Sequence, residues 1–117
     1  VDDQLGRLTF TRDMAEAIFH VLGTHAPYGT YDCTGSGAVK SWADIARAVF
    51  EAANGNGENV VPVSTADYYA NASDPIAPRP VHSALDLSKL EAAGFHMPDW
   101  EEELGEYLDA ISSKGSI

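Results

Sequence analysis

The sequence is poor in cysteine, in basic residues and in long apolar runs. Cys33 is the one cysteine among 117 residues, so no disulfide can form within the chain. This is typical of proteins in a reducing compartment, and we expect a cytoplasmic protein. There are 7 Lys and Arg against 18 Asp and Glu, for a net charge of −11. That balance argues against binding to nucleic acid or to an anionic membrane, because both need clustered cations. No apolar run is long enough to span a bilayer.

Several motifs of catalysis and ligand binding are also missing. The four histidines lack the spacing of zinc ligands, and we expect no metal site. No G-x-S-x-G nucleophile motif occurs. The glycines never form the fingerprint of a dinucleotide site, and no tyrosine is followed four residues later by lysine. The chain therefore has no legible catalytic centre of its own.

What the sequence does contain predicts one globular domain over residues 1–117. The hydrophobic fraction of 44% suits a folded core. Amphipathic patterns with start and stop signals predict four helices. Thr11, Ser41, Asp86 and Asp99 are the expected caps, and Asp44 completes a capping box with Ser41. The predicted helices span residues 12–22, 42–53 and 87–93, and the last one starts at 100.

Short β candidates lie between these helices, at residues 29–33, 60–63 and 81–85, and the chain opens on a further strand stub. We expect Cys33 to be a buried residue of the first of them rather than a nucleophile. The order of elements predicts a small mixed α/β domain, or α+β for the chain by itself. It would have about four helices and three to four short strands.

Two features suggest contact with phosphate. The glycine-rich Thr34–Gly37 resembles a phosphate loop but lacks its lysine, and we favour a plain turn between elements. Arg79 lies between Pro78 and Pro80, which stiffen its backbone before any ligand arrives. Such a guanidinium can bind a pair of phosphate oxygens, although a solvated arginine or a local pair with Asp74 fits the sequence equally well.

Four segments, in this order, resemble the dTDP-4-dehydrorhamnose reductases of the extended short-chain dehydrogenase/reductase superfamily. The opening VDDQLGRLTFT with D-M-A resembles the family's V-D-D-Q-x-G-x-P-T-x…D-L-A, and GTYDCTGSG followed by S-W resembles G-x-Y-H-x-x-G-S-G…S-W. VSTADY resembles V-x-T-x-x-Y, and the stretch from R-P to P-D-W resembles R-P-x-x-S-x-L-D-x-S-K-L…L-P-D-W. The chain departs from the family at Arg7 and Leu8, where the turn after Gly6 is altered, and over residues 69–77, which read as an enlarged loop.

The resemblance covers only the C-terminal, substrate-binding part of such a reductase. It implies a parent enzyme whose missing N-terminal Rossmann half binds NADPH and carries the catalytic tyrosine and lysine. By this interpretation the chain binds a dTDP-sugar in dTDP-L-rhamnose biosynthesis and is not catalytically competent alone. The parent is in some lineages fused to the preceding epimerase. We also expect self-association, through apolar surface that the Rossmann half would otherwise cover.

The resemblance also implies site residues. Arg79, in the R-P position, would face the diphosphate, and Gln4 and Thr9 would border the nucleotide-sugar pocket. Tyr68 would stack on the nucleotide or hydrogen-bond to it, unless it is a packing residue. Two other functions remain open: a non-enzymatic nucleotide-sugar binding or scaffold module, and the C-terminal part of another nucleotide-sugar epimerase or dehydratase.

Overall fold

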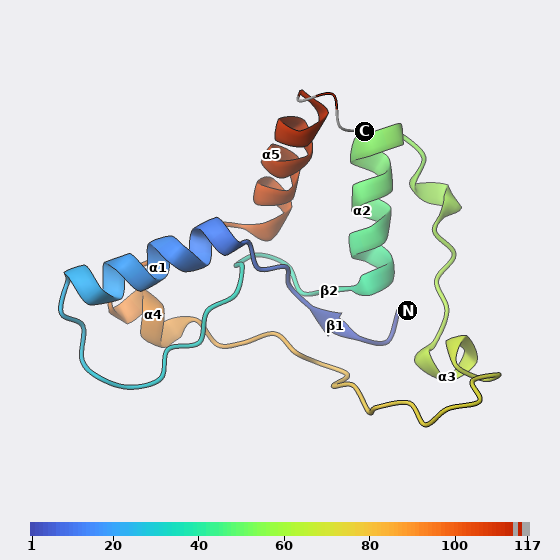
Figure 1. Cartoon of the computed structure of the whole chain (residues 1–117), viewed down its shortest axis with the longest axis horizontal. Coiled ribbons are helices and arrows are strands. Elements are labelled where there is room, and N and C mark those ends of the chain that lie inside the picture. Colours follow the sequence, from blue (N-terminus) through green and yellow to red (C-terminus); the bar gives the residue numbers. More distant parts are fainter. Residues whose placement is uncertain (114, 116–117) are drawn as a thin grey trace. The chain divides into compact units, whose positions relative to one another are not determined.

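The computed structural model describes residues 1–113 and 115, which form two compact units. Unit 1 consists of Val1–Gly6 and Val39–Ser83, and unit 2 of Arg7–Ala38 and the described residues from Ala84 onward. Each unit therefore joins two stretches that are distant in the sequence, and both units consist mainly of helices and extended loops (Figure 1).

Unit 1 is organised around its N-terminal segment. β1 (Leu5–Gly6) pairs antiparallel with β2 (Lys40–Ser41). The backbone N–H of Leu5 donates to Val81 O at 2.8 Å, and the Leu5 carbonyl accepts from Ser83 N at 2.8 Å. The N-terminal segment thus has a paired strand and a second extended stretch as neighbours, which fixes the path of the residues just before it.

The helices of unit 1 begin at side-chain caps. α2 (Trp42–Asn54) starts at Ser41, whose Oγ accepts from the Asp44 N–H at 3.1 Å, and the predicted capping box is confirmed. Gly55 ends α2 in the left-handed region, with φ of 66°. The short helices η1 (Gly57–Asn59) and α3 (Thr65–Tyr68) were not predicted from the sequence.

Unit 2 has the larger apolar core. It contains α1 (Thr11–Gly23), α4 (Ser88–Ala92) and α5 (Trp100–Ser112), with α4 alongside α1 (Figure 1). The core cluster consists of buried residues from α1, α4 and the segments that flank α4: Ala17, Leu87, Leu90 and Met97. The Cys33 Sγ contacts the Met97 Sδ at 3.5 Å, and burial raises the pKa of its thiol, which agrees with a packing role.

All four predicted helices are present, and the mixed α/β class is confirmed. The cap of α1 is Phe10 rather than Thr11, because Thr11 already lies in the helix. The Asp99 carboxylate accepts from Glu101 N at 2.8 Å and caps α5 as predicted.

β1 lies in the predicted opening strand stub, but the three strand positions predicted between the helices are wrong. Residues 29–33 and 60–63 run without forming a strand, and residues 81–85 contribute a single bridge, between His82 and Leu5. Val63 illustrates the reason: its carbonyl accepts one bond from Asp2 N, but no ladder continues from it. Apolar extended residues become a strand only when a neighbour supplies successive partners.

Burial differs among the apolar residues of the helices. Trp42, the first residue of α2, is 54% exposed. On α1 the side chains of Met14, Ile18 and Leu22 are exposed, whereas Ala17 is buried. Within the part of the chain that the structure describes, no helix combines the length and apolar character needed to cross a membrane.

Candidate functional site

A polar cluster joins the N-terminal segment of unit 1 to the start of α3. The Thr65 N–H donates to Asp3 Oδ2 at 2.9 Å, and the Thr65 hydroxyl donates to Asp3 Oδ1 at 2.6 Å. These two bonds hold the pKa of the Asp3 carboxyl below its usual range, the side-chain bond contributing most. Asp3 is therefore an ionised acceptor at neutral pH that fixes the first residue of α3.

Gln4 belongs to the same cluster. Its Nε2 donates to Thr65 Oγ1 at 2.9 Å, and its backbone carbonyl accepts from Trp42 N at 3.3 Å. The side chain is partly buried, so it is held by the protein and still reachable from solvent. This arrangement agrees with a binding residue whose side chain is placed before a ligand arrives.

Tyr68 ends α3, one turn after Thr65. Its side chain is 64% exposed, and its ring meets that of Tyr69 edge-on, with 4.9 Å between the ring centroids. One ring face is therefore not needed for core packing, and the alternative of a half-buried packing tyrosine does not describe this side chain.

Arg79 precedes the stretch that pairs with β1. Because Leu5 N binds Val81 O, the backbone two residues after Arg79 lies next to β1, just past Gln4. Arg79 is exposed and makes no hydrogen bond or ion pair with any other residue that the structure describes, Asp74 included. Its guanidinium is thus available to an anion.

Thr9 lies in unit 2, whereas Gln4, Tyr68 and Arg79 lie in unit 1. The Thr9 hydroxyl is 2.9 Å from the hydroxyl of the buried Thr34. The structure therefore brings three of the four predicted site residues into one unit and gives the fourth a partner of its own.

The Thr34–Gly37 loop of unit 2 is a structural turn, as favoured above. Gly35 N donates to Leu8 O at 3.0 Å, and Ser36 N donates to Pro98 O at 2.9 Å. Gly37 has a φ of 95°, and a Cβ there would collide with the Asp99 carboxylate. Two of the loop's N–H groups are already used within the chain, which leaves no cradle for a phosphate.

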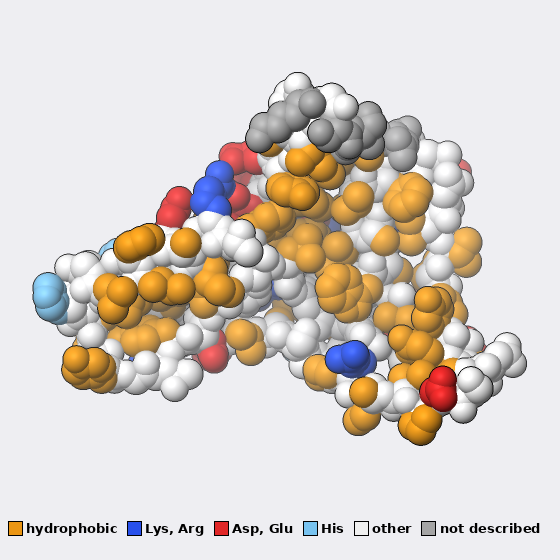
Figure 2. Space-filling view, in the orientation of Figure 1, with side chains coloured by type: hydrophobic (Ala, Val, Ile, Leu, Met, Phe, Trp, Pro, Cys, Tyr) orange, Lys and Arg blue, Asp and Glu red, His pale blue; other side chains and the backbone are white. Residues whose placement is uncertain are grey.

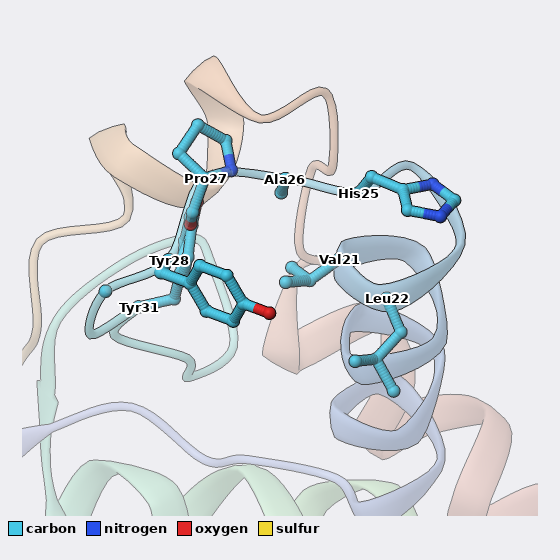
Figure 3. A pocket seen from close by; sticks show the side chains of 8 residues that line it. Val21, Leu22, His25, Ala26, Pro27, Tyr28 and Tyr31 are labelled. Carbon is cyan, nitrogen blue, oxygen red and sulfur yellow. The ribbon is translucent and has the colours of Figure 1, made fainter.

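Unit 2 also has a hollow of about 370 Å³ beyond the C-terminal end of α1. Figure 3 shows Val21 and Tyr28 turned toward each other across it, whereas the His25 ring points away. None of the four predicted site residues lines this hollow. Its lining is mainly apolar, and it offers few groups that would orient a polar ligand.

Sequence reasoning missed Asp3 and Thr65. A signal for the start of α3 was present, because Ser64 and Asp67 repeat the spacing of Ser41 and Asp44. In the structure Ser64 Oγ accepts from Asp67 N at 3.0 Å. The pairing of Thr65 with Asp3 spans 62 positions and has no counterpart in local sequence.

The RmlD substrate binding domain model matches residues 1–113. The chain belongs to this family. Two curated relatives are each 36% identical to it: the spore coat polysaccharide biosynthesis protein SpsK of Bacillus subtilis, over 97% of the chain, and a dTDP-4-dehydrorhamnose reductase of Aggregatibacter actinomycetemcomitans, over 89%. In both cases this RmlD substrate binding domain spans 37% of the relative's length.

Solved structures extend the similarity to three dimensions. A dTDP-4-dehydrorhamnose reductase from Clostridium acetobutylicum matches 96% of the domain with a TM-score of 0.77 and 30% identity. One from Bacillus anthracis, in complex with NADP, matches 93% with a TM-score of 0.71 and 28% identity. The domain covers 38% and 36% of those two chains. The predicted resemblance to this reductase family is confirmed.

Proposed function

We propose that residues 1–117 act as one substrate-binding part of an NADPH-dependent dTDP-4-dehydrorhamnose reductase, in the biosynthesis of dTDP-L-rhamnose for polysaccharide. The observation that carries the proposal is the family match over residues 1–113, together with relatives that are reductases of this name. The ligand is a dTDP-sugar. The chain acts on it only together with a cofactor-binding part.

The residues described here do not fit NADPH. A dinucleotide needs a glycine-rich loop with free N–H groups at the start of a helix. The glycine-rich Thr34–Gly37 loop, which resembles a phosphate loop in sequence, donates the N–H groups of Gly35 and Ser36 to Leu8 and Pro98. We therefore assign NADPH, and with it the reducing step, to the remainder of a longer protein.

Within the domain, Arg79 supplies the positive charge for the diphosphate. Its guanidinium has no other described partner, and phosphate recognition by arginine is bidentate. Gln4 binds the sugar or the base through its amide, and Tyr68 offers its exposed ring to the nucleotide. Thr9 lies in unit 2, where its hydroxyl is 2.9 Å from that of Thr34, so we leave it out of this site.

The test is a titration of the ¹⁵N-labelled chain with dTDP and dTDP-rhamnose, followed by amide shifts. We expect weak binding, because the domain by itself encloses little of the ligand. Arg79→Gln weakens it about 10- to 100-fold, the effect of losing a charge-assisted pair. The matched control is Arg47→Gln, an arginine of the same unit whose guanidinium is engaged with Asp44 at 2.9 Å. An equal loss of affinity in both variants would mean that Arg79 is not part of the site. The absence of any amide shift at millimolar ligand would contradict the proposed function.

We also propose that the apolar face of α1 packs against the cofactor-binding part. The exposed fractions of its side chains are 39% for Met14, 53% for Ile18, 75% for Phe19 and 68% for Leu22. Figure 2 shows apolar side chains gathered over α1. A face of this kind on one helix is typical of an interface, and the relatives carry well over half of their length outside the matched region.

Without that part, the uncovered face makes the isolated chain self-associate. Sedimentation at rising concentration should show dimers or larger species for the chain, and a monomer for the double variant Ile18→Asp, Leu22→Asp. Val61→Asp is the control, since Val61 is 79% exposed but lies in unit 1. A double variant that sediments like the unmodified chain would contradict this role of α1.

A further inference from the structure

The Thr65 hydroxyl lies between two side chains of the N-terminal segment. Its Oγ1 is 2.6 Å from Asp3 Oδ1 and 2.9 Å from Gln4 Nε2. Asp3 also accepts from the Thr65 N–H at 2.9 Å, so the carboxylate is fixed through both of its oxygens. All three residues belong to unit 1.

The directions of these bonds follow from which atoms carry protons. An ionised carboxylate only accepts, and a threonine hydroxyl has one proton to donate. The two bonds from Thr65 also keep Asp3 ionised, since they lower its pKa. Thr65 therefore donates to Asp3, and its oxygen is left to accept from Gln4.

That requirement sets the orientation of the Gln4 amide. The NH₂ group must face Thr65, because the reversed amide would place two acceptor oxygens 2.9 Å apart. The amide oxygen is then turned away from Thr65, and it has no hydrogen-bond partner among residues 1–113 and 115. An otherwise free rotation of the amide is removed by the protein itself.

We propose that Asp3 and Thr65 are positioning residues that present Gln4 Oε1 as a hydrogen-bond acceptor for an N–H or O–H donor of the ligand. The inference rests on the proposed function and adds to it which part of the ligand binds at which residue. The neutral donors of the nucleotide-sugar lie at Gln4, where the Asp3 charge disfavours phosphate, and the diphosphate lies at Arg79.

Three groups of a dTDP-sugar supply such a donor: the imide N–H of the thymine, the 3′-hydroxyl of the deoxyribose and the hydroxyls of the hexose. The imide edge is the better match, because an acceptor stands next to its donor and can take the second N–H of Gln4. The three sources are separated by ligands that each lack one of them. They are N3-methyl-dTDP, which has no imide N–H, 3′-deoxy-dTDP, which has no deoxyribose hydroxyl, and dTDP, which has no hexose.

The first measurement needs no ligand. In the ¹⁵N-labelled chain we expect one side-chain amide proton of Gln4 to be shifted and slowed in exchange by its bond to Thr65. Thr65→Val, which keeps the shape and removes the hydroxyl, should abolish that signature, and Thr65→Ser should restore it. An unchanged Gln4 signal in Thr65→Val overturns the inference, whatever any ligand does.

The second measurement is the ratio of dissociation constants for dTDP and N3-methyl-dTDP. We expect the chain to prefer dTDP by about tenfold, and Thr65→Val to reduce this preference about 3- to 10-fold, with Thr65→Ser close to the unmodified chain. If the hexose is the source, the ratio of the dissociation constants for dTDP-rhamnose and dTDP changes in this way instead. If the deoxyribose is the source, the ratio for dTDP and 3′-deoxy-dTDP changes.

A merely structural role of Thr65 would weaken the binding of all these ligands equally and leave every ratio unchanged, which would overturn the inference while the proposed function stands. No binding of any dTDP ligand to the unmodified chain would contradict the proposed function and the ligand half of the inference. The amide orientation is then still decided by the first measurement.

Discussion

The two units are stabilised by different kinds of contact. Unit 2 contains the cluster around Leu90 and Met97 and the fully buried Trp100. In unit 1 the N-terminal segment is attached largely by hydrogen bonds, from Asp2 N to Val63 O, from Ala43 N to Val1 O and between Thr65 and Asp3. Gln4, one of the residues that we assign to the ligand, lies among those polar contacts. In unit 1, therefore, the hydrogen bonds that stabilise the unit also hold a residue of the proposed site. The core of unit 2 has no described part in binding.

Two tryptophans, one in each unit, occupy equivalent positions in their helices but differ in burial. Trp42 and Trp100 each follow a helix cap, Ser41 in unit 1 and Asp99 in unit 2. Trp100 is 0% exposed and its Nε1 donates to Ala38 O at 2.8 Å, whereas Trp42 is 54% exposed. The two tryptophans occupy the same position relative to a helix cap, so that position alone does not decide whether the side chain is buried.

The largest expected effect is that of Trp100→Ala. Removing a fully buried tryptophan should lower the free energy of unfolding by about 3–5 kcal/mol, because the cavity cannot be refilled completely. Trp42→Ala is the matched control and should cost about 1 kcal/mol or less. Urea unfolding followed by circular dichroism measures both.

Equal costs at the two positions would contradict the contrast between the units. Should Trp100→Ala fail to fold, Trp100→Phe serves instead. It keeps most of the apolar volume, removes the donor to Ala38 O and should cost about 1–3 kcal/mol.

Helices were predictable from the sequence because their signals are local. The Ser41 capping box and the Asp99 cap act within four residues, and both are present in the structure as expected. Strands were not predictable, because a strand is defined by its partner. Residues 60–63 have the composition of a strand, but Val63 meets only one donor from the N-terminal segment.

The candidate site follows the same rule. Arg79 stood out because two prolines flank it, which is a local fact, and Gln4, Thr9 and Tyr68 came from a resemblance to a family. Asp3 and Thr65 have ordinary side chains, and their importance comes from a contact across 62 positions. The separation of Thr9 from the other three, in a different unit, also had no sequence signal.

A smaller expected effect, which also distinguishes the two units, is the dependence of their stability on pH. Because its bonds to Thr65 hold the pKa of Asp3 below its usual value of about 3.9, ionised Asp3 stabilises the folded state at pH above that value. The contribution is lost as pH falls through the lower, folded pKa. Asp3→Asn cannot titrate there, so unit 1 of that variant should be less stable at neutral pH and should lose less stability between about pH 5 and pH 2.

The control for this prediction is Asp86→Asn in unit 2. The pKa of Asp86 is also lowered, mainly by the N–H of Ser88 at 2.8 Å, so its substitution should flatten the acid response of unit 2 instead. Amide signals assigned to each unit, followed from pH 7 to pH 2, separate the two responses. An acid response of unit 1 that is the same with aspartate or asparagine at position 3 would mean that the Asp3 pair with Thr65 positions side chains without stabilising the unit. A smaller loss of unit 1 stability with acid in Asp3→Asn would show that the bonds orienting Gln4 also attach α3 to the N-terminal segment.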